Sequence, residues 1–127
     1  VGCACARASA VGDYDLTCFR ACLHELAAPV APAHPGRKAL NLDGDFLLAE
    51  PAASDNLEDS INPVARLYYA ASTAVCTPCS LSQEVGAALG AQAGEKRLAE
   101  AMKEAGFTSV RRAAETAFNI ILQCRVS

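Results

Sequence analysis

The side chains with the most evident chemistry are thiols, because the sequence contains seven cysteines. Six of them and one histidine fall in three groups that together offer enough sulfur and nitrogen for a zinc site. The groups are Cys3 and Cys5; Cys18, Cys22 and His24; and Cys76 and Cys79. Only Cys76 and Cys79 have the spacing of a zinc knuckle, and they lack an obvious second pair. Cys18 and Cys22 fall in one predicted buried strand, too far apart along it to share a metal easily. We therefore expect buried apolar thiols and no metal ligand.

Polar side chains follow the predicted strands. His24 and Glu25 come directly after an apolar run, at the carboxyl edge where ligands bind in open α/β sheets. A histidine that merely caps the loop is the alternative. Four more candidates lie around the exit of the next apolar run and on the following helix, namely Glu50, Asn62, Arg66 and Tyr69. Arg66 and Tyr69 could orient an anionic or aromatic small molecule, although structural roles compete with this interpretation.

Composition narrows the classes of protein that fit. The chain has 127 residues, 52% of them hydrophobic, and a formal net charge of -3 without a block of like charge. It is long enough for one domain with a real core. The charge argues against nucleic-acid binding, which needs a basic face. No apolar run approaches the roughly 18 to 20 residues that cross a bilayer, and the start does not resemble a signal peptide, so we expect a cytoplasmic protein with reduced thiols.

The elements that must position these side chains begin with two predicted buried strands. Residues 1–12 are rich in small residues and form an irregular lead-in to a domain over 13–127. The apolar run Asp15–Leu23 predicts a central strand covered on both faces. Prolines between residues 27 and 40 preclude a long regular helix and leave at most a short one over Arg37–Leu42. Phe46–Glu50 is the second buried strand.

The second half of the chain is mainly helical before it returns to the sheet. Asn62 as cap and Pro63 at the first position predict a helix over 63–75, with an apolar stripe that includes Leu67, Tyr68 and Val75, ended by Thr77-Pro78. A short helix over Ser80–Gly90 follows. Glu95–Ala105 predicts an amphipathic helix that ends at Gly106. Phe107–Arg112 and Phe118–Val126 predict a pair of antiparallel strands.

The order of these elements resembles the carboxyl-terminal half of a class I S-adenosylmethionine (SAM)-dependent methyltransferase. The segment DYDLTCFRACLHEL looks like the fourth strand of that fold, ALNLDGDFLLAEP like the fifth, and EAGFTSVRR and FNIILQCRV like the sixth and seventh. The helical segment between them is similar to the substrate-side insertion of a bacterial subgroup with a winged-helix accessory domain. The resemblance implies an α/β fold with half of a Rossmann-like sheet, in strand order 4-5-7-6 with the last strand antiparallel, flanked by helices.

The resemblance also implies roles for individual residues. The loop after the fourth strand lies beside the methyl group in such enzymes, so His24, next to Glu25, is the candidate general base or clamp on an acceptor. Ala21, Cys22 and Leu23 would line the SAM site, with Ala21 standing where the subgroup tends to carry an acid. The family's glycine-rich cofactor loop and the acid ending its second strand are not present in the sequence. We therefore expect weak or absent SAM binding by this chain alone.

Three functions stay open at this point. The first is a methyltransferase-like domain that contributes the acceptor-side half of a site for a small-molecule acceptor and is inactive alone. The second is a non-catalytic homodimeric scaffold, and the third is a thiol or metal-binding protein. Without three preceding strands, Asp15–Leu23 would be an open, apolar edge. We expect two copies to pair there about a two-fold axis and form a homodimer.

Overall fold

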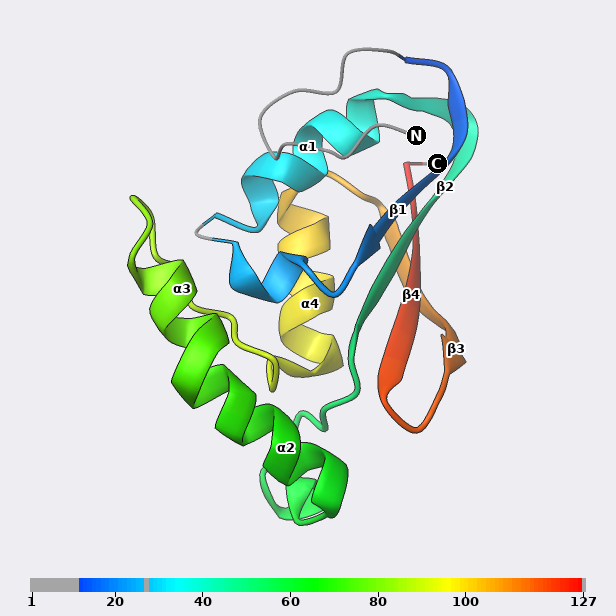
Figure 1. The fold of residues 1–127 in the computed structure, drawn as a ribbon. Coiled ribbons are helices and arrows are strands. Elements are labelled where there is room, and N and C mark those ends of the chain that lie inside the picture. Colours follow the sequence, from blue (N-terminus) through cyan, green and yellow to red (C-terminus); the bar gives the residue numbers. More distant parts are fainter. Residues whose placement is uncertain (1–11, 27, 127) are drawn as a thin grey trace.

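The sheet has the predicted strand order. The computed structural model describes residues 12–26 and 28–126, so the predicted lead-in over 1–12 lies outside the described residues except for Gly12. The strands are β1 (Tyr14–Arg20), β2 (Leu40–Pro51), β3 (Ser109–Glu115) and β4 (Asn119–Arg125). They lie in the order β1-β2-β4-β3 (Figure 1). β1 and β2 are parallel, whereas β4 is antiparallel to both of its neighbours, which confirms the predicted order 4-5-7-6.

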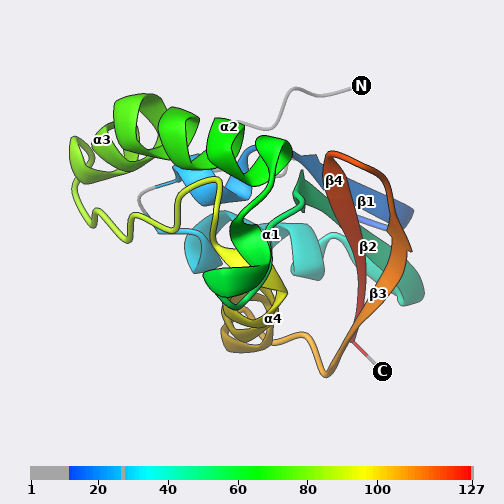
Figure 2. The same cartoon turned by 90° about the horizontal axis from the view of Figure 1, so that it is seen from below.

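The described helices lie on one side of this sheet (Figure 2). Burial accordingly alternates along β2, where Phe46, Leu48 and Glu50 are buried and the residues between them are only half-buried. The same face of β4 adds Leu122 to the core. In β1 only Phe19 is buried. The prediction that this strand is covered on both faces is therefore wrong for the described part of the chain.

The end of β1 also differs from the prediction. The strand stops at Arg20, and Ala21 has a φ of 47°, in the left-handed region that a strand cannot continue through. The chain then forms a 3-10 helix, η1 (Leu23–Glu25). The predicted last residues of the strand are therefore the approach to a helical turn, and this turn carries His24.

A helix crosses the proline-rich segment that was expected to be broken. Helix α1 (Val30–Lys38) contains Pro32 and Pro35. Pro32 is the third helical residue, where the N–H group has no partner within the helix, so a proline there loses no hydrogen bond. Pro35 lies inside the helix and removes one of its hydrogen bonds. Gly36 lets α1 approach the sheet, because a Cβ atom at this position would lie 2.8 Å from the ring of Phe46.

The next helical region is continuous where a break was predicted. Helix α2 (Pro63–Ala71) passes into a π-helix, η3 (Ser72–Cys76), and then into α3 (Thr77–Leu81). In η3 the Thr77 N–H donates to the carbonyl of Ser72, five residues earlier. This wider turn directly precedes Pro78, whose ring would clash with a carbonyl in a continuous α-helix. The predicted helix over Ser80–Gly90 is wrong, because helical structure ends at Leu81.

The buried side of this helical region consists of small side chains, two of them polar and two apolar. Its buried residues are Ala65, Ser72, Cys76 and Ser80. The predicted apolar stripe is wrong, since Leu67 is 58% and Val75 57% exposed. Small side chains allow this helix to lie close to η1, whereas the larger apolar groups face outward.

One further helical element, the 3-10 helix η2 (Glu58–Ser60), lies between β2 and α2. The elements after α3 confirm the predictions closely. Helix α4 (Gly94–Glu104) buries Leu98, Ala101 and Met102, and then β3 and β4 form the expected antiparallel pair.

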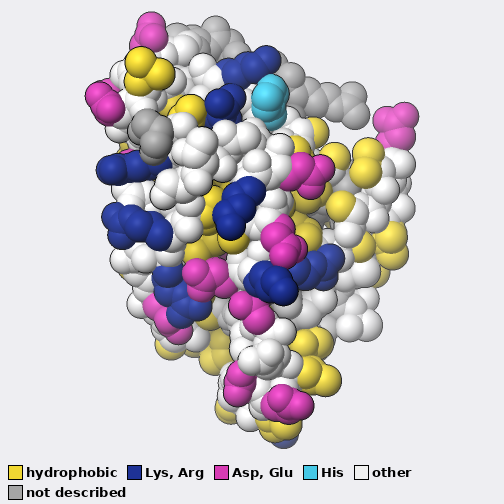
Figure 3. All heavy atoms as spheres, turned by 180° about the vertical axis from the view of Figure 1, so that it is seen from behind, with side chains coloured by type: hydrophobic (Ala, Val, Ile, Leu, Met, Phe, Trp, Pro, Cys, Tyr) yellow, Lys and Arg dark blue, Asp and Glu magenta, His cyan; other side chains and the backbone are white. Residues whose placement is uncertain are grey.

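Among the described helices, none combines the length and apolar character needed to cross a membrane. Figure 3 shows acidic and basic side chains interspersed on one face of the molecule, without a large area of either.

Candidate functional site

The parallel pairing of β1 and β2 brings their carboxyl ends to one edge of the sheet. The Ala21 N–H donates to the Ala49 carbonyl at 2.7 Å, which holds the chain beside β2 as it leaves β1. Glu50 is the next residue of β2, and the turn η1 places His24 against it. Both residues are candidates from the sequence, and the structure brings them together.

Glu50 is an acceptor at both of its carboxylate oxygens. Its Oε1 accepts from the N–H groups of Cys22 at 3.1 Å and Leu23 at 2.9 Å. Its Oε2 makes a short hydrogen bond with Nδ1 of His24. An ionised carboxylate can only accept, so Nδ1 carries a proton, and in the neutral ring the lone pair is then on Nε2. Glu50 is 1% and His24 5% exposed, so this pair is held away from solvent.

Glu25 and Cys76 complete the surroundings of the free nitrogen. Nε2 of His24 lies 3.8 Å from Oε1 of Glu25, and Sγ of Cys76 lies 3.7 Å from the same oxygen. Cys76 is buried and comes from η3, while the side chain of Glu25 is 42% exposed. Burial, together with the negative charge of Glu25, raises the pKa of the Cys76 thiol. We call His24, Glu25, Glu50 and Cys76 the His24 site.

Backbone and side-chain contacts attach α3 and the following loop to η1. Ser80 Oγ donates to the Leu26 carbonyl at 2.9 Å, and Gln83 Nε2 donates to the Glu25 carbonyl at 3.0 Å. The Gly90 N–H donates to the His24 carbonyl at 3.2 Å. The η1 turn is therefore fixed from the sheet side by Glu50 and from the helical side by these three donors.

The three residues predicted to line a SAM site have few free groups. The N–H groups of Ala21, Cys22 and Leu23 all donate within the chain, and the Leu23 side chain is completely buried. Burial, followed by the charge of Glu50, raises the pKa of the Cys22 thiol. Only the exposed Ala21 and the half-buried Cys22 side chains remain available to a ligand.

The predicted acceptor residues on α2 do not join this arrangement. Asn62 caps the helix, since its Oδ1 accepts from the Ala65 N–H at 2.9 Å. Arg66 and Tyr69 are exposed, and neither side chain makes a hydrogen bond or ion pair with another described residue. Tyr68, which the helical pattern assigned to the core, is half-buried and donates through its hydroxyl to the Phe118 carbonyl at 2.5 Å.

The thiols are distributed differently from the expectation. Cys76 is buried but Cys79 is exposed, so the two do not point to a common site. Cys18 is exposed on β1 and Cys22 lies beyond the end of that strand, so they do not share a face of one buried strand. Cys124 is completely buried in β4, and burial raises the pKa of its thiol from 9.0 to about 12. Cys3 and Cys5 lie outside the described residues.

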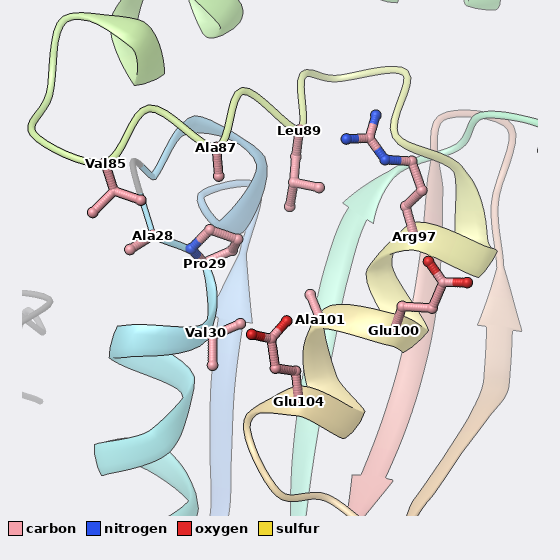
Figure 4. Close-up of a pocket in the computed structure, with 10 residues that line it drawn as sticks. All are labelled: Ala28, Pro29, Val30, Val85, Ala87, Leu89, Arg97, Glu100, Ala101 and Glu104. Carbon is pink, nitrogen blue, oxygen red and sulfur yellow. The ribbon is translucent and has the colours of Figure 1, made fainter.

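A shallow pocket has none of the four residues of the His24 site in its lining. It has a volume of about 370 Å³ and is formed by the start of α1, the loop before α4 and α4 itself. Figure 4 shows apolar side chains such as Val30 and Leu89 on one side, with Arg97, Glu100 and Glu104 of α4 on the other. No catalytic candidate lines it, so the chemistry of the chain is better judged from the His24 site.

Sequence reasoning missed the position of Cys76. It paired this residue with Cys79, whereas the structure pairs it with Glu25, 51 positions earlier. A signal for this was present, because the spacing of Ala65, Ser72, Cys76 and Ser80 places small side chains on one side of a continuous helix. The predicted break at Thr77-Pro78 concealed the pattern.

Comparison with known proteins places the fold but not the activity. No protein-family model and no curated protein matches the chain. Solved structures do. PigF with SAH has a TM-score of 0.62 at 18% identity, over 91% of this chain and 31% of that one. An O-methyltransferase family protein from Burkholderia thailandensis has a TM-score of 0.60 at 18% identity, over 91% and 31%.

A putative O-methyltransferase from Nostoc punctiforme PCC 73102 gives a TM-score of 0.60 at 18% identity, over 91% of this chain and 33% of that one. The chain thus spans about a third of the length of the structures it matches. Its strand order, with β4 antiparallel between β2 and β3, is the order expected for the last four strands. The chain therefore has the fold of the carboxyl-terminal part of the class I SAM-dependent methyltransferases.

Proposed function

We propose that this chain forms the acceptor-side half of a SAM-dependent methyltransferase site and that His24 is its general base. The observation that carries the proposal is the buried bond between His24 Nδ1 and Glu50 at the carboxyl edge of the sheet. Ligands bind at this edge in open α/β sheets. Structural neighbours such as PigF, which was solved with SAH, support the class of reaction.

The His24 site supplies the proton chemistry of this reaction. Glu50 fixes the ring so that Nε2, the nitrogen with a lone pair, faces Glu25 and Cys76. A hydroxyl group of a small acceptor that reaches Nε2 loses its proton to the ring, and the imidazolium is stabilised by Glu50. A bound SAM would supply the methyl group. Ala21 and Cys22 are the residues of this chain that could touch it.

These residues form an edge of a cofactor site and not a complete one. The N–H groups of Ala21, Cys22 and Leu23 already donate hydrogen bonds within the chain, and the sequence contains no glycine-rich loop. The proposal therefore includes the expectation that the chain is inactive by itself and that a further polypeptide segment holds the cofactor.

A chimaera tests the proposal. The chain would replace the segment that it matches in the Burkholderia thailandensis protein, and transfer from labelled SAM would be measured with a panel of small hydroxylated aromatic acceptors. We expect His24→Gln to lower kcat at least about 100-fold, the lower end for general base catalysis. His34→Gln, in the exposed second histidine, should change kcat less than about twofold. Equal rates for the two variants would contradict the assignment of His24.

A measurement on the chain alone covers the case in which the chimaera does not fold. Nitrogen NMR of the imidazole ring reports which nitrogen of His24 carries the proton. We expect the proton on Nδ1 in the wild-type chain. A proton on Nε2, or a proton that exchanges equally between the two nitrogens, would contradict the assignment of Nε2 as the base.

The exposed edge of β1 favours a second function, homodimerisation. Within the described residues β1 pairs only with β2, and Leu16 is 53% and Tyr14 45% exposed. Such an edge offers unpaired backbone groups to another strand. We propose that two copies of β1 pair antiparallel about a two-fold axis, which gives one continuous eight-stranded sheet.

Light scattering tests this second function. We expect twice the mass of 13.2 kDa for the wild-type chain. Cys18→Pro or Phe19→Pro should give monomers or aggregates, because proline removes a donor from the strand. Leu67→Ser, in the exposed face of α2, is the control and should leave the mass unchanged. A stable wild-type monomer would exclude the dimer.

A further inference from the structure

We infer that His24, Glu25 and Cys76 form a binding site for a zinc ion. Their ligand atoms, Nε2, a carboxylate oxygen and Sγ, all lie within 4.8 Å of one another. The three residues come from two segments that are about 50 positions apart, η1 and η3, so their convergence is a product of the fold. The inference concerns residues that the cysteine spacing did not combine.

The distances are close to those that a tetrahedral ion requires. With Zn–N and Zn–O near 2.0 to 2.1 Å and Zn–S near 2.3 Å, tetrahedral angles place nitrogen and oxygen about 3.3 Å apart and sulfur and oxygen about 3.5 Å apart. The observed separations are 3.8 Å for His24 to Glu25 and 3.7 Å for Cys76 to Glu25. A contraction of a few tenths of an ångström brings these two pairs to tetrahedral distances, and Glu25, as a partly exposed side chain, can make that movement. The third pair, Nε2 of His24 and Sγ of Cys76, lies within 4.8 Å and must close to about 3.6 Å when the ion binds.

Glu50 provides the outer support that histidine ligands of zinc usually have. A metal-binding histidine commonly donates its other ring N–H to a carboxylate, which fixes the tautomer and the orientation of the ring. His24 makes this bond with Glu50, and Glu50 is itself held by the N–H groups of Cys22 and Leu23. In the neutral ring the lone pair therefore lies at Nε2, beside the other two ligands, before any ion binds.

Charge and chemical type favour zinc over magnesium or calcium. A nitrogen, a sulfur and one carboxylate oxygen suit a borderline-soft ion, whereas magnesium and calcium prefer oxygen ligands. Among the described residues, no lysine or arginine pairs with Glu25 or Glu50, so a divalent cation would balance their charge. Binding replaces the proton of the Cys76 thiol, which leaves to solvent. Three protein ligands leave the fourth position for water.

An ion reaches the site from solvent on the side where Glu25 lies. Its side chain is 42% exposed, whereas His24 and Cys76 are each 5% exposed. An ion can therefore enter past one carboxylate and become enclosed on the remaining sides. It would occupy the nitrogen that the proposed methyl transfer needs as a base, so zinc would inhibit that reaction.

Cobalt titration of the untagged, chelator-treated chain in reducing buffer tests the site. We expect one Co²⁺ per chain, with the visible bands of a tetrahedral ion and a thiolate-to-cobalt charge-transfer band, and displacement of Co²⁺ by Zn²⁺. Cys76→Ala should abolish the charge-transfer band and weaken binding at least about tenfold. Cys79→Ala, on the same helical region but exposed, is the matched control and should bind as the wild-type chain does.

Two further variants keep the test decisive. Glu25→Gln keeps the shape of a partly exposed side chain, so the fold should persist. It should weaken binding at least about tenfold while the charge-transfer band persists. Replacing Cys3 and Cys5 together with serine should leave binding unchanged. No Co²⁺ binding by the wild-type chain, or binding that survives Cys76→Ala and is lost with Cys3 and Cys5, would overturn the inference. Neither methyl donor nor acceptor is present, so the result is independent of the proposed function.

Discussion

Replacement of Glu50 should separate its structural role from its control of the histidine ring. Glu50→Ala removes the acceptor of two buried donors, the Leu23 N–H and the His24 ring. It also removes the acceptor of the Cys22 N–H, which belongs to a half-buried residue. A buried donor left without an acceptor costs about 1 to 3 kcal/mol, so the two buried groups together cost about 2 to 6 kcal/mol. This is a large part of the roughly 5 to 15 kcal/mol that stabilises a typical domain.

Glu50→Gln should behave differently because its shape is unchanged. The carbonyl oxygen of the new side chain still accepts from the Cys22 and Leu23 N–H groups, whereas its NH₂ group faces Nδ1 of His24. The ring must then accept at Nδ1 and carry its proton on Nε2. We expect a loss below about 2 kcal/mol, since a charged hydrogen bond is exchanged for a neutral one.

Urea unfolding followed by circular dichroism measures the first effect, and nitrogen NMR of the ring measures the second. Glu84→Ala, in an exposed loop, is the control for the loss of a carboxylate and should change the free energy of unfolding by less than about 0.5 kcal/mol. The reasoning fails if Glu50→Ala is as stable as Glu84→Ala. It also fails if the ring tautomer is the same in Glu50→Gln as in the wild-type chain.

Three other predictions address the cofactor, a buried thiol and a close backbone approach. Calorimetry should show no tight SAM binding by this chain alone; a dissociation constant in the low micromolar range, near -8 kcal/mol, would contradict this. The Cys124 thiol ionises near pH 9.0 when unfolded and near 12 when folded, so stability should fall as the pH rises through this interval, by up to about 4 kcal/mol. Cys124→Ala should remove that part of the slope, and an unchanged slope would refute the assignment. Gly90→Ala should lower the free energy of unfolding more than Gly86→Ala does. Both glycines have positive φ, but a Cβ atom at Gly90 would lie 2.3 Å from Ser72 Oγ, whereas at Gly86 the nearest atom would be 3.5 Å away. Equal losses in urea unfolding would show that φ alone decides.

Elements with a strong local signal were predictable. Asn62 and Pro63 mark the start of α2, and the spacing of Leu98, Ala101 and Met102 predicts the buried side of α4. In both cases the information lies within a few residues. The sheet order followed from the resemblance to a known fold and not from the strands themselves, since the apolar pattern does not specify which strands are neighbours.

Elements that depend on the rest of the fold were not predictable. Pro29, Pro32, Pro35 and Gly36 together suggested a break in the segment that forms α1. Pro32, however, occupies a helical position whose N–H group needs no partner, and this position is known only when the helix start is known. The His24 site needs contacts across 26 positions to Glu50 and 51 positions to Cys76. The sequence singled out His24 and Glu50 separately, and only the parallel pairing of β1 and β2 combines them.

The π-helix η3 sets the rotational phase of α3 relative to α2. An α-helix turns by about 100° per residue, so a segment with one residue too many for regular winding shifts every later side chain around the axis. Deleting one residue, such as Ala74, and letting the region rewind as a plain α-helix would change this phase little, because the wide turn already takes up one extra residue. Rewinding the unchanged sequence as a plain α-helix would instead turn Cys76 and Ser80 by up to about 100° with respect to Ala65. The sulfur would then leave the vicinity of His24 while the helix stayed intact. The thiol beside the histidine therefore depends on how one turn of this helix is wound, and not on the residues of the helix alone.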